Sequence, residues 1–126
     1  ATFTRDGVDE SCAFLMKYPD NRLSISHATI AANTPVEATL YGSEGMIHLH
    51  TRWHHTPKVT VTRFDEAEPQ VYEFPFDGWG YQFEAAHVMD CLDAGRTESD
   101  IVPLAFTLDL NWCLEVLLGK MGVKYG

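Results

Sequence analysis

Alternation of apolar and polar residues dominates the first part of the chain and predicts strands. From Val8 to Tyr18 the two kinds of residue alternate with a period of two, which is typical of a half-buried strand. Pro19-Asp20-Asn21 has the chemistry of a turn and predicts a hairpin with a second strand at about residues 22–32. In this hairpin we expect Leu23 and Ile25 to share the buried face of the first strand.

Four further short strands are predicted, at Val36–Tyr41, Met46–His50, Lys58–Phe64 and Gln70–Phe74. Gly42-Ser43-Glu44-Gly45 separates two of them, because paired glycines accept backbone conformations that other residues resist. No helix is predicted between the strands, and the connections are short. The pattern therefore favours a mostly antiparallel sheet of about six strands over repeated strand–helix–strand units.

Helical spacing appears only near the end of the chain. Tyr81, Ala85, Val88 and Leu92 fall on one helical face, and Gly95 is suited to a helix stop. Pro103 is suited to the start of a second helix. An apolar stripe then extends to a predicted end at Gly119, and it comprises Phe106, Leu110, Cys113, Leu114 and Leu117. The predicted fold class is α+β, with two C-terminal helices on one face of an open sheet and residues 1–126 forming a single domain.

The second face of the predicted sheet has no element left to cover it. Its residues are small or apolar: Ala13, Leu15, Ser24, Ser26, Ala28, Thr39, Tyr41, Thr60, Thr62, Tyr72 and Phe74. Such a face predicts contact with a second sheet or domain. The alternative is a threonine-rich face in water, since antiparallel sheets often have one wet face.

Composition narrows the function classes. The 126 residues include 45% hydrophobic and 21% charged residues, typical of a soluble globular domain. The net charge of −9, with scattered basic residues, argues against a nucleic-acid partner. No apolar run reaches the roughly 18 residues of a membrane span. Three widely spaced cysteines give no disulfide framework, so we expect a reducing, cytoplasmic location.

Histidines and a tryptophan gather in the stretch His48 to His55. His48 and His50 are expected on the same face of a strand, a geometry compatible with a divalent metal. No neighbouring carboxylate or cysteine completes a ligand set, so we expect no metal and a surface or pocket-rim role. Trp53 offers a flat stacking surface for a substrate ring, or else it packs over the end of the sheet.

No self-contained active site is predicted. Glu84 and His87 lie three residues apart on a helix, but a general acid–base pair also needs a cleft, so we interpret them as a surface pair. Cys91 and Cys113 accompany apolar helical stripes and are expected in the core. The chain contains no glycine-rich nucleotide loop and no hydrolase or metalloprotease motif. We therefore expect no catalytic, cofactor-binding or metal-binding residue in this chain.

A set of spaced motifs resembles the C-terminal domain of the Gfo/Idh/MocA family of NAD(P)-dependent oxidoreductases, in its dihydrodiol dehydrogenase-like branch. They are the Gly42–Gly45 turn, Gly80-Tyr81, Glu84, His87-Val88, Cys91-Leu92, Gly95, Glu98-Ser99, Pro103-Leu104 and the ending Met121-Gly122-Val123-Lys124-Tyr125. Each motif alone is weak, whereas their order and spacing together are specific. The resemblance covers nearly the whole chain.

The resemblance implies a fragment of a longer, two-domain protein. The N-terminal Rossmann domain, which would bind NAD or NADP, would precede residue 1 and be the partner of this domain. This domain would help to shape the substrate pocket for a sugar, polyol or diol, and would form a homodimer through its open sheet face. Trp53, Phe76 and Trp79 correspond to positions where relatives present aromatic residues to the substrate. The alternative is a free-standing dimeric α+β module that binds a ligand or acts as a scaffold.

Overall fold

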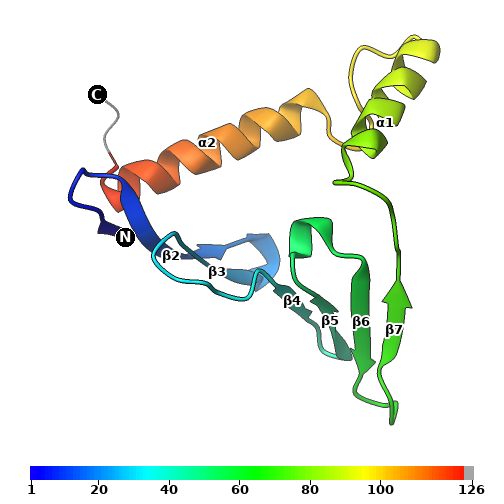
Figure 1. Cartoon of the computed structure of the whole chain (residues 1–126), viewed down its shortest axis with the longest axis horizontal. Helices are drawn as coiled ribbons and strands as arrows, with labels where there is room; N and C mark the ends of the chain where they lie inside the picture. The colour runs from blue at the N-terminus through cyan, green and yellow to red at the C-terminus, as the bar shows by residue number, and fades with distance from the viewer. Residues whose placement is uncertain (124–126) are drawn as a thin grey trace. The chain divides into compact units, whose positions relative to one another are not determined.

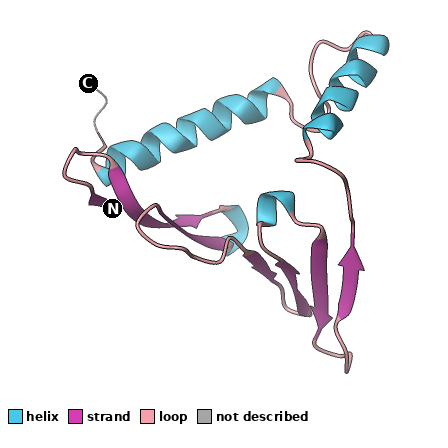
Figure 2. Ribbon diagram, in the orientation of Figure 1, coloured by secondary structure: helices cyan, strands magenta, loops and turns pink. Residues whose placement is uncertain are grey.

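The computed structural model describes residues 1–123 and divides the chain into two compact units. The first unit contains residues 1–34 and the stretch from residue 98 onward, and the second contains residues 35–97. Each unit combines one antiparallel sheet with one helix (Figures 1 and 2). Lys124 and Tyr125, part of the expected family ending, lie outside the described residues.

The first unit holds a three-stranded sheet in the order β1-β2-β3 and the helix α2. Its elements are β1 (Thr2–Phe3), β2 (Asp9–Lys17), β3 (Leu23–Thr29) and α2 (Leu104–Met121). The predicted hairpin is confirmed as β2–β3. A short 3-10 helix, η1 (Pro19–Asn21), makes its turn. Asp20 and Asn21 have φ values of 65° and 59°, a left-handed conformation that Asp and Asn tolerate better than most residues.

The register of this hairpin corrects one prediction. Leu15 pairs with Ile25 and Lys17 with Leu23, so Leu23 and Ile25 lie on the Leu15 face. The other face pairs Phe14 with Ser26 and Met16 with Ser24, the reverse of the predicted arrangement. The physical reason is that shifting a register by one residue moves every side chain to the opposite face. The length and shape of the η1 turn set this register, and strand periodicity does not reveal them.

Helix α2 contacts the face that carries Met16. The Cys113 Sγ atom lies 3.8 Å from the Met16 Sδ atom, and Figure 1 shows the C-terminal end of α2 beside β2. Ser24 and Ser26 share the face of Met16. The opposite face is open: Ile25 is 81% exposed, and Leu15 and Leu23 are also exposed. An apolar sheet face therefore remains uncovered within the described residues.

The second unit holds a four-stranded sheet in the order β4-β5-β6-β7 and the helix α1. The elements are β4 (Ala38–Tyr41), β5 (Gly45–Leu49), β6 (Lys58–Arg63), β7 (Gln70–Glu73) and α1 (Tyr81–Asp93). Gly45 faces the backbone of β6 so closely that a side chain would collide with the Thr62 carbonyl oxygen. Tyr72 pairs with Val59 and therefore lies opposite to the predicted threonine face.

The α+β class, the antiparallel pairing and the C-terminal position of both helices are confirmed. The prediction of one sheet of about six strands with both helices on one face needs correction. Seven strands form two sheets, and each unit holds one helix. The irregular stretch between β3 and β4, where Pro35 lacks a backbone donor, separates the sheets. The assignment of residues 1–126 to a single domain stays a prediction.

Glycine ends both helices by the same physical means. Gly95 follows α1 with a φ of 66°, and the Arg96 N–H donates to the Cys91 carbonyl at 2.8 Å, so the predicted stop is confirmed. Helix α2 continues beyond the predicted end at Gly119. It stops where Gly122 adopts a φ of 82° and the Val123 N–H donates to the Leu118 carbonyl at 3.1 Å. Gly119 is therefore an interior residue of α2.

A carboxylate ties the segment before β4 to the end of β5. Thr51 Oγ1 donates to Glu37 Oε1 at 2.8 Å, and His48 Nε2 lies 3.1 Å from Glu37 Oε2. The hydrogen bond from Thr51, followed by that from His48, lowers the pKa of the Glu37 carboxyl from its ordinary value of 4.5. Because Thr51 opens the loop that follows β5, this anchoring fixes where the loop starts.

Little of the described chain is fully buried. Cys91, at 7% exposure, is the only residue of the described part that is classed as buried, as expected for a core cysteine. Many large apolar residues of both helices are exposed, among them Phe106, Leu108 and Trp112 on α2. Across residues 1–123, neither helix is both long and apolar enough to cross a membrane. Exposed apolar surface on this scale is typical of surfaces that contact other protein.

The ends of α2 allow a test of backbone conformation alone. Gly122→Ala should destabilise the chain by about 1 kcal/mol, because alanine resists a positive φ. The matched control is Gly119→Ala inside the same helix, which should stabilise by roughly 0.5–1 kcal/mol. An added methyl group meets nothing within 4 Å at either position. Urea unfolding followed by circular dichroism measures both, and a destabilising Gly119→Ala would contradict this account.

The anchoring of Glu37 predicts a pH-dependent stability. Since its folded-state pKa is lowered, Glu37 contributes stability above its ordinary pKa of 4.5, and this contribution is lost as pH falls through the folded-state value. Glu37→Gln should therefore lower the unfolding midpoint at about pH 7 and have a smaller effect at about pH 3.5. Glu68→Gln, in the exposed β6–β7 loop, is the control. An equal effect of Glu37→Gln at both pH values would rule out the ionised anchor.

Candidate functional site

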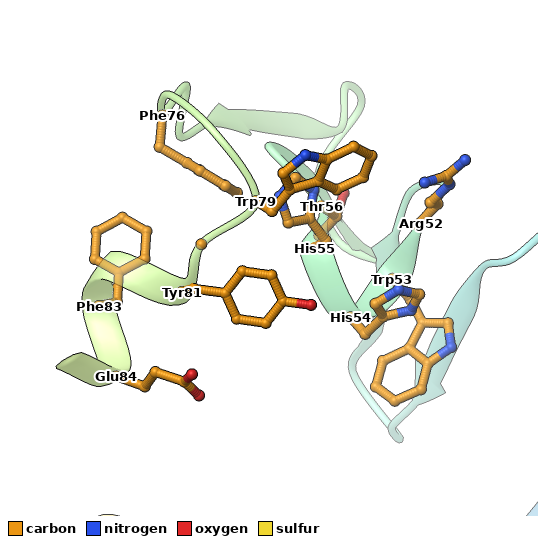
Figure 3. A pocket seen from close by; sticks show the side chains of 11 residues that line it. Arg52, Trp53, His54, His55, Thr56, Phe76, Trp79, Tyr81, Phe83 and Glu84 are labelled. Atoms are coloured by element: carbon orange, nitrogen blue, oxygen red, sulfur yellow. The ribbon is translucent and has the colours of Figure 1, made fainter.

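A cavity of about 540 Å³ opens in the second unit, where the loop after β5 meets the turn before α1. Figure 3 shows the two segments facing each other across it. The lining residues are Arg52, Trp53, His54, His55, Thr56, Phe76, Trp79, Gly80, Tyr81, Phe83 and Glu84. Aromatic side chains make up much of this lining. The cavity therefore offers flat apolar faces with a few polar groups among them.

Local hydrogen bonds hold the loop after β5 in place. The Trp53 N–H donates to the Val36 carbonyl at 2.8 Å, and the His55 N–H donates to the Arg52 carbonyl at 2.8 Å. These bonds shape the short 3-10 helix η2 (Trp53–His55). Thr56 Oγ1 donates to the Lys58 carbonyl at 2.8 Å, which joins the loop to β6. The loop thus presents consecutive large side chains from a fixed backbone.

Two glycines shape the turn before α1. Gly78 and Gly80 have φ values of 76° and 86°, so other residues would be strained at both positions. Gly80 also lies against the loop, because a side chain there would begin 3.7 Å from the His55 Cδ2 atom. The Gly80 carbonyl accepts from the Phe83 N–H at 3.0 Å and starts the helix. Trp79 therefore lies between two glycines with positive φ.

Ring contacts join the loop to the turn. The His55 ring lies 4.7 Å from Phe76 in an edge-to-face arrangement and 5.7 Å from Trp79 at a tilt of 41°. Phe76 also contacts Phe83 edge-to-face at 5.6 Å. Aromatic rings prefer such offset and perpendicular geometries. His55 is thus the residue through which the loop packs on the segment preceding α1.

Charged and polar groups lie around this aromatic cluster. The Arg52 guanidinium lies over the Trp79 ring, 5.9 Å from its centroid, within the range of a cation–π contact. Trp79 is 67% exposed and Trp53 is 51% exposed, so both present open ring faces. Figure 3 shows the Tyr81 hydroxyl directed toward the loop and the Glu84 carboxylate on the same side of the cavity. The site combines stacking surfaces with hydrogen-bonding groups.

One polar atom of the cluster lacks a partner. His55 Nε2 is shielded from solvent, and among the described residues no group hydrogen-bonds to it. Leaving a buried polar group unpaired costs about 1–3 kcal/mol. Most buried polar groups in proteins are paired, so an exception calls for an explanation.

The three residues expected at the substrate pocket all line this one cavity. Phe76 and Trp79 contact His55, and Trp53 contacts the neighbouring His54 edge-to-face at 5.6 Å. Whether they contact a substrate stays a prediction. Arg52 and Tyr81 were not expected here; helical spacing had placed Tyr81 only on one face of α1, and the structure places it at the cavity.

The other candidate residues lie elsewhere. His48 and His50 share a strand face as expected, with ring centroids 4.3 Å apart. Glu37 lies beside His48, and His50 Nε2 lies 2.8 Å from Thr60 Oγ1. A carboxylate next to His48 was not foreseen, because Glu37 is distant in sequence. These protein partners account for one nitrogen of each ring without a metal.

The lining does not fit the pyrophosphate of a dinucleotide. Phosphate-binding loops use glycine-rich backbone N–H groups at a helix start. Here Arg52 is the one arginine or lysine among the residues that line the cavity, and its guanidinium is stacked on Trp79. The helix start at Gly80 lies against the His55 ring. What the arrangement can do is bind a small, flat, partly apolar molecule with polar substituents.

Comparison with known proteins finds relatives of the chain. No family model matches it. Three relatives are trans-1,2-dihydrobenzene-1,2-diol dehydrogenases: that of Xenopus laevis is 31% identical over an alignment of 126 positions, that of mouse 32% over 123, and that of human 30% over 125. Each alignment covers 94% of the chain but 37% of the relative. The chain is thus homologous to the C-terminal part of the dihydrodiol dehydrogenases of the Gfo/Idh/MocA family.

Proposed function

We propose that this chain is the substrate-side and oligomerisation part of an NAD(P)-dependent oxidoreductase that acts on a sugar, polyol or diol. The observation that carries the proposal is the aromatic cavity in a chain homologous to dehydrogenases. The chain spans little more than a third of those relatives, so the activity belongs to a longer protein. The homology favours this proposal over a free-standing binding module.

The cavity suits a cyclic substrate that carries hydroxyl groups. Trp53, Phe76 and Trp79 supply flat faces for the ring, and Tyr81 and Glu84 supply hydrogen-bonding groups. The relatives are named for a compound of this kind, a benzene-derived ring with two neighbouring hydroxyls. Among the three substrate types, the apolar walls favour a diol on a largely hydrocarbon ring.

The nicotinamide cofactor is assigned to an N-terminal Rossmann domain. The lining residues do not fit a dinucleotide, so the residues of this chain bind and orient the substrate. The cofactor supplies the hydride acceptor or donor when it is bound. The three cysteines are free thiols, in keeping with a reducing compartment such as the cytoplasm.

The uncovered apolar surface supports contacts with other protein. On the open face of the β2–β3 hairpin, Leu15, Leu23 and Ile25 lie side by side and are exposed. A second copy of the same face matches it, since a two-fold interface brings the same residues together from both subunits. We assign the homodimer contact to this face, in place of the serine face expected from the sequence.

Replacing Trp79 tests the division of labour between this chain and the rest of the enzyme. In the full-length natural protein, Trp79→Ala should raise KM for trans-1,2-dihydrobenzene-1,2-diol roughly tenfold, because the ring loses a stacking surface. KM for the nicotinamide cofactor should stay unchanged. Steady-state kinetics with each substrate varied in turn measures both values.

The matched control is Phe64→Ala, an exposed aromatic residue that does not line the cavity. It should leave both KM values within about twofold of the unsubstituted enzyme. A Trp79→Ala enzyme with an unchanged KM for the diol would overturn the placement of substrate in this cavity. A raised KM for the cofactor would overturn the proposed division of labour.

Introducing a charge into the apolar face tests the dimer. Ile25→Lys should convert the dimeric protein to a monomer in static light scattering, because a buried unpaired charge is costly at an interface. Ile101→Lys is the control: Ile101 is 74% exposed but lies in the loop before α2. A dimer that persists in Ile25→Lys would place the interface on another surface.

A further inference from the structure

We propose that His55 anchors a ligand hydroxyl through its Nε2 atom, which becomes available when the Trp79 side chain turns aside. The inference rests on the proposed function and deepens it, because it names the group that recognises the substrate. Three observations carry it: an unpaired ring nitrogen, an exposed tryptophan ring next to the histidine, and an apolar wall beside it.

The His55 Nε2 atom is suited to a hydrogen bond with a hydroxyl group. His55 Nε2 is shielded from solvent and has no hydrogen-bond partner among the described residues, although His55 lines the cavity. A neutral imidazole nitrogen donates or accepts according to its tautomer, and a hydroxyl group does both. A hydroxyl placed here therefore forms the missing hydrogen bond in either tautomer.

The exposed side chain of Trp79 can change rotamer without a change in the backbone. It is 67% exposed, its ring lies 5.7 Å from the His55 ring, and Figure 3 shows it lying over His55. The Arg52 guanidinium lies 5.9 Å from the centroid of the indole. In the proposed movement the indole turns away from His55, and Phe76 keeps its contact with the His55 ring.

The wall beside His55 decides which hydroxyl compounds fit. Phe76 meets the His55 ring edge-to-face at 4.7 Å and packs on Phe83. A ligand that bonds to Nε2 therefore places its ring against hydrocarbon, and the displaced Trp79 can stack on its outer face. This arrangement selects flat rings with a hydroxyl at one edge over open-chain polyols.

The test uses two probes of nearly the same shape, catechol and ortho-xylene, in which methyl groups replace the two hydroxyls. Both are titrated into the full-length natural protein, and NMR follows the indole N–H resonances to give dissociation constants. His55→Phe keeps a flat ring but removes both nitrogens. It should weaken catechol binding about fivefold to tenfold and leave ortho-xylene binding unchanged.

Two further variants keep the test informative. His55→Gln retains a donor and an acceptor and should preserve part of the preference for catechol, which also covers the case in which His55→Phe does not fold. Phe64→Ala replaces an exposed aromatic residue that does not line the cavity and should change neither constant. Catechol should also shift the Trp79 indole resonance in the unsubstituted protein.

The outcomes separate the two proposals. Equal weakening of both probes by His55→Phe would show that His55 only shapes the cavity, and would overturn this inference alone. An unmoved Trp79 resonance at saturating catechol would overturn the displacement of Trp79. If the unsubstituted protein binds neither catechol nor ortho-xylene, the proposed function is overturned, and this inference with it.

Discussion

Both sheets carry apolar side chains on both faces, while each unit contains a single helix, and the rest of the structure depends on this imbalance. In the first unit α2 contacts the Met16 face, and Leu15 and Ile25 are exposed on the other. In the second unit Ile47 and Val71 are exposed on opposite faces. Burying apolar surface yields about 25 cal/mol per Å². Contacts with other protein surfaces that bury these exposed side chains therefore add to the stability of both units.

The geometry of the candidate site does not depend on burial of these apolar faces, because interactions within the loop and the turn build it. Backbone hydrogen bonds fix the loop that carries Trp53 and His55, and two glycines with positive φ fix the turn that carries Trp79. Ring contacts between His55 and Phe76 then join the two segments. Function placed on loops that a sheet holds in position is a common arrangement in enzymes. Here the sheet contributes position, and the loops contribute the chemistry.

Local periodicity predicted β2 to β7, the helices and the Gly95 stop, because these depend on neighbouring residues, but it missed the two-residue strand β1. It could not predict the pairing of Leu15 with Ile25, which depends on turn geometry, or the division into two sheets. Helical spacing gave no sign that Tyr81 lines a cavity, since an apolar stripe does not distinguish a core from a cavity wall. The grouping of Trp53, Phe76 and Trp79 followed from family resemblance. The contact of His55 with Trp79 joins residues far apart in sequence, beyond any local pattern.

The histidines show why residue type alone does not locate a site. His48 and His50 lie on a strand, where Glu37 and Thr60 satisfy one nitrogen of each. His55 comes a few residues later, but the 3-10 turn carries it into a cluster of aromatic rings without a hydrogen-bond partner in the described chain. A buried unpaired nitrogen lowers stability, and proteins keep such features mainly where function requires them. The unpaired histidine, and not the paired ones, is therefore where recognition of a ligand is to be sought.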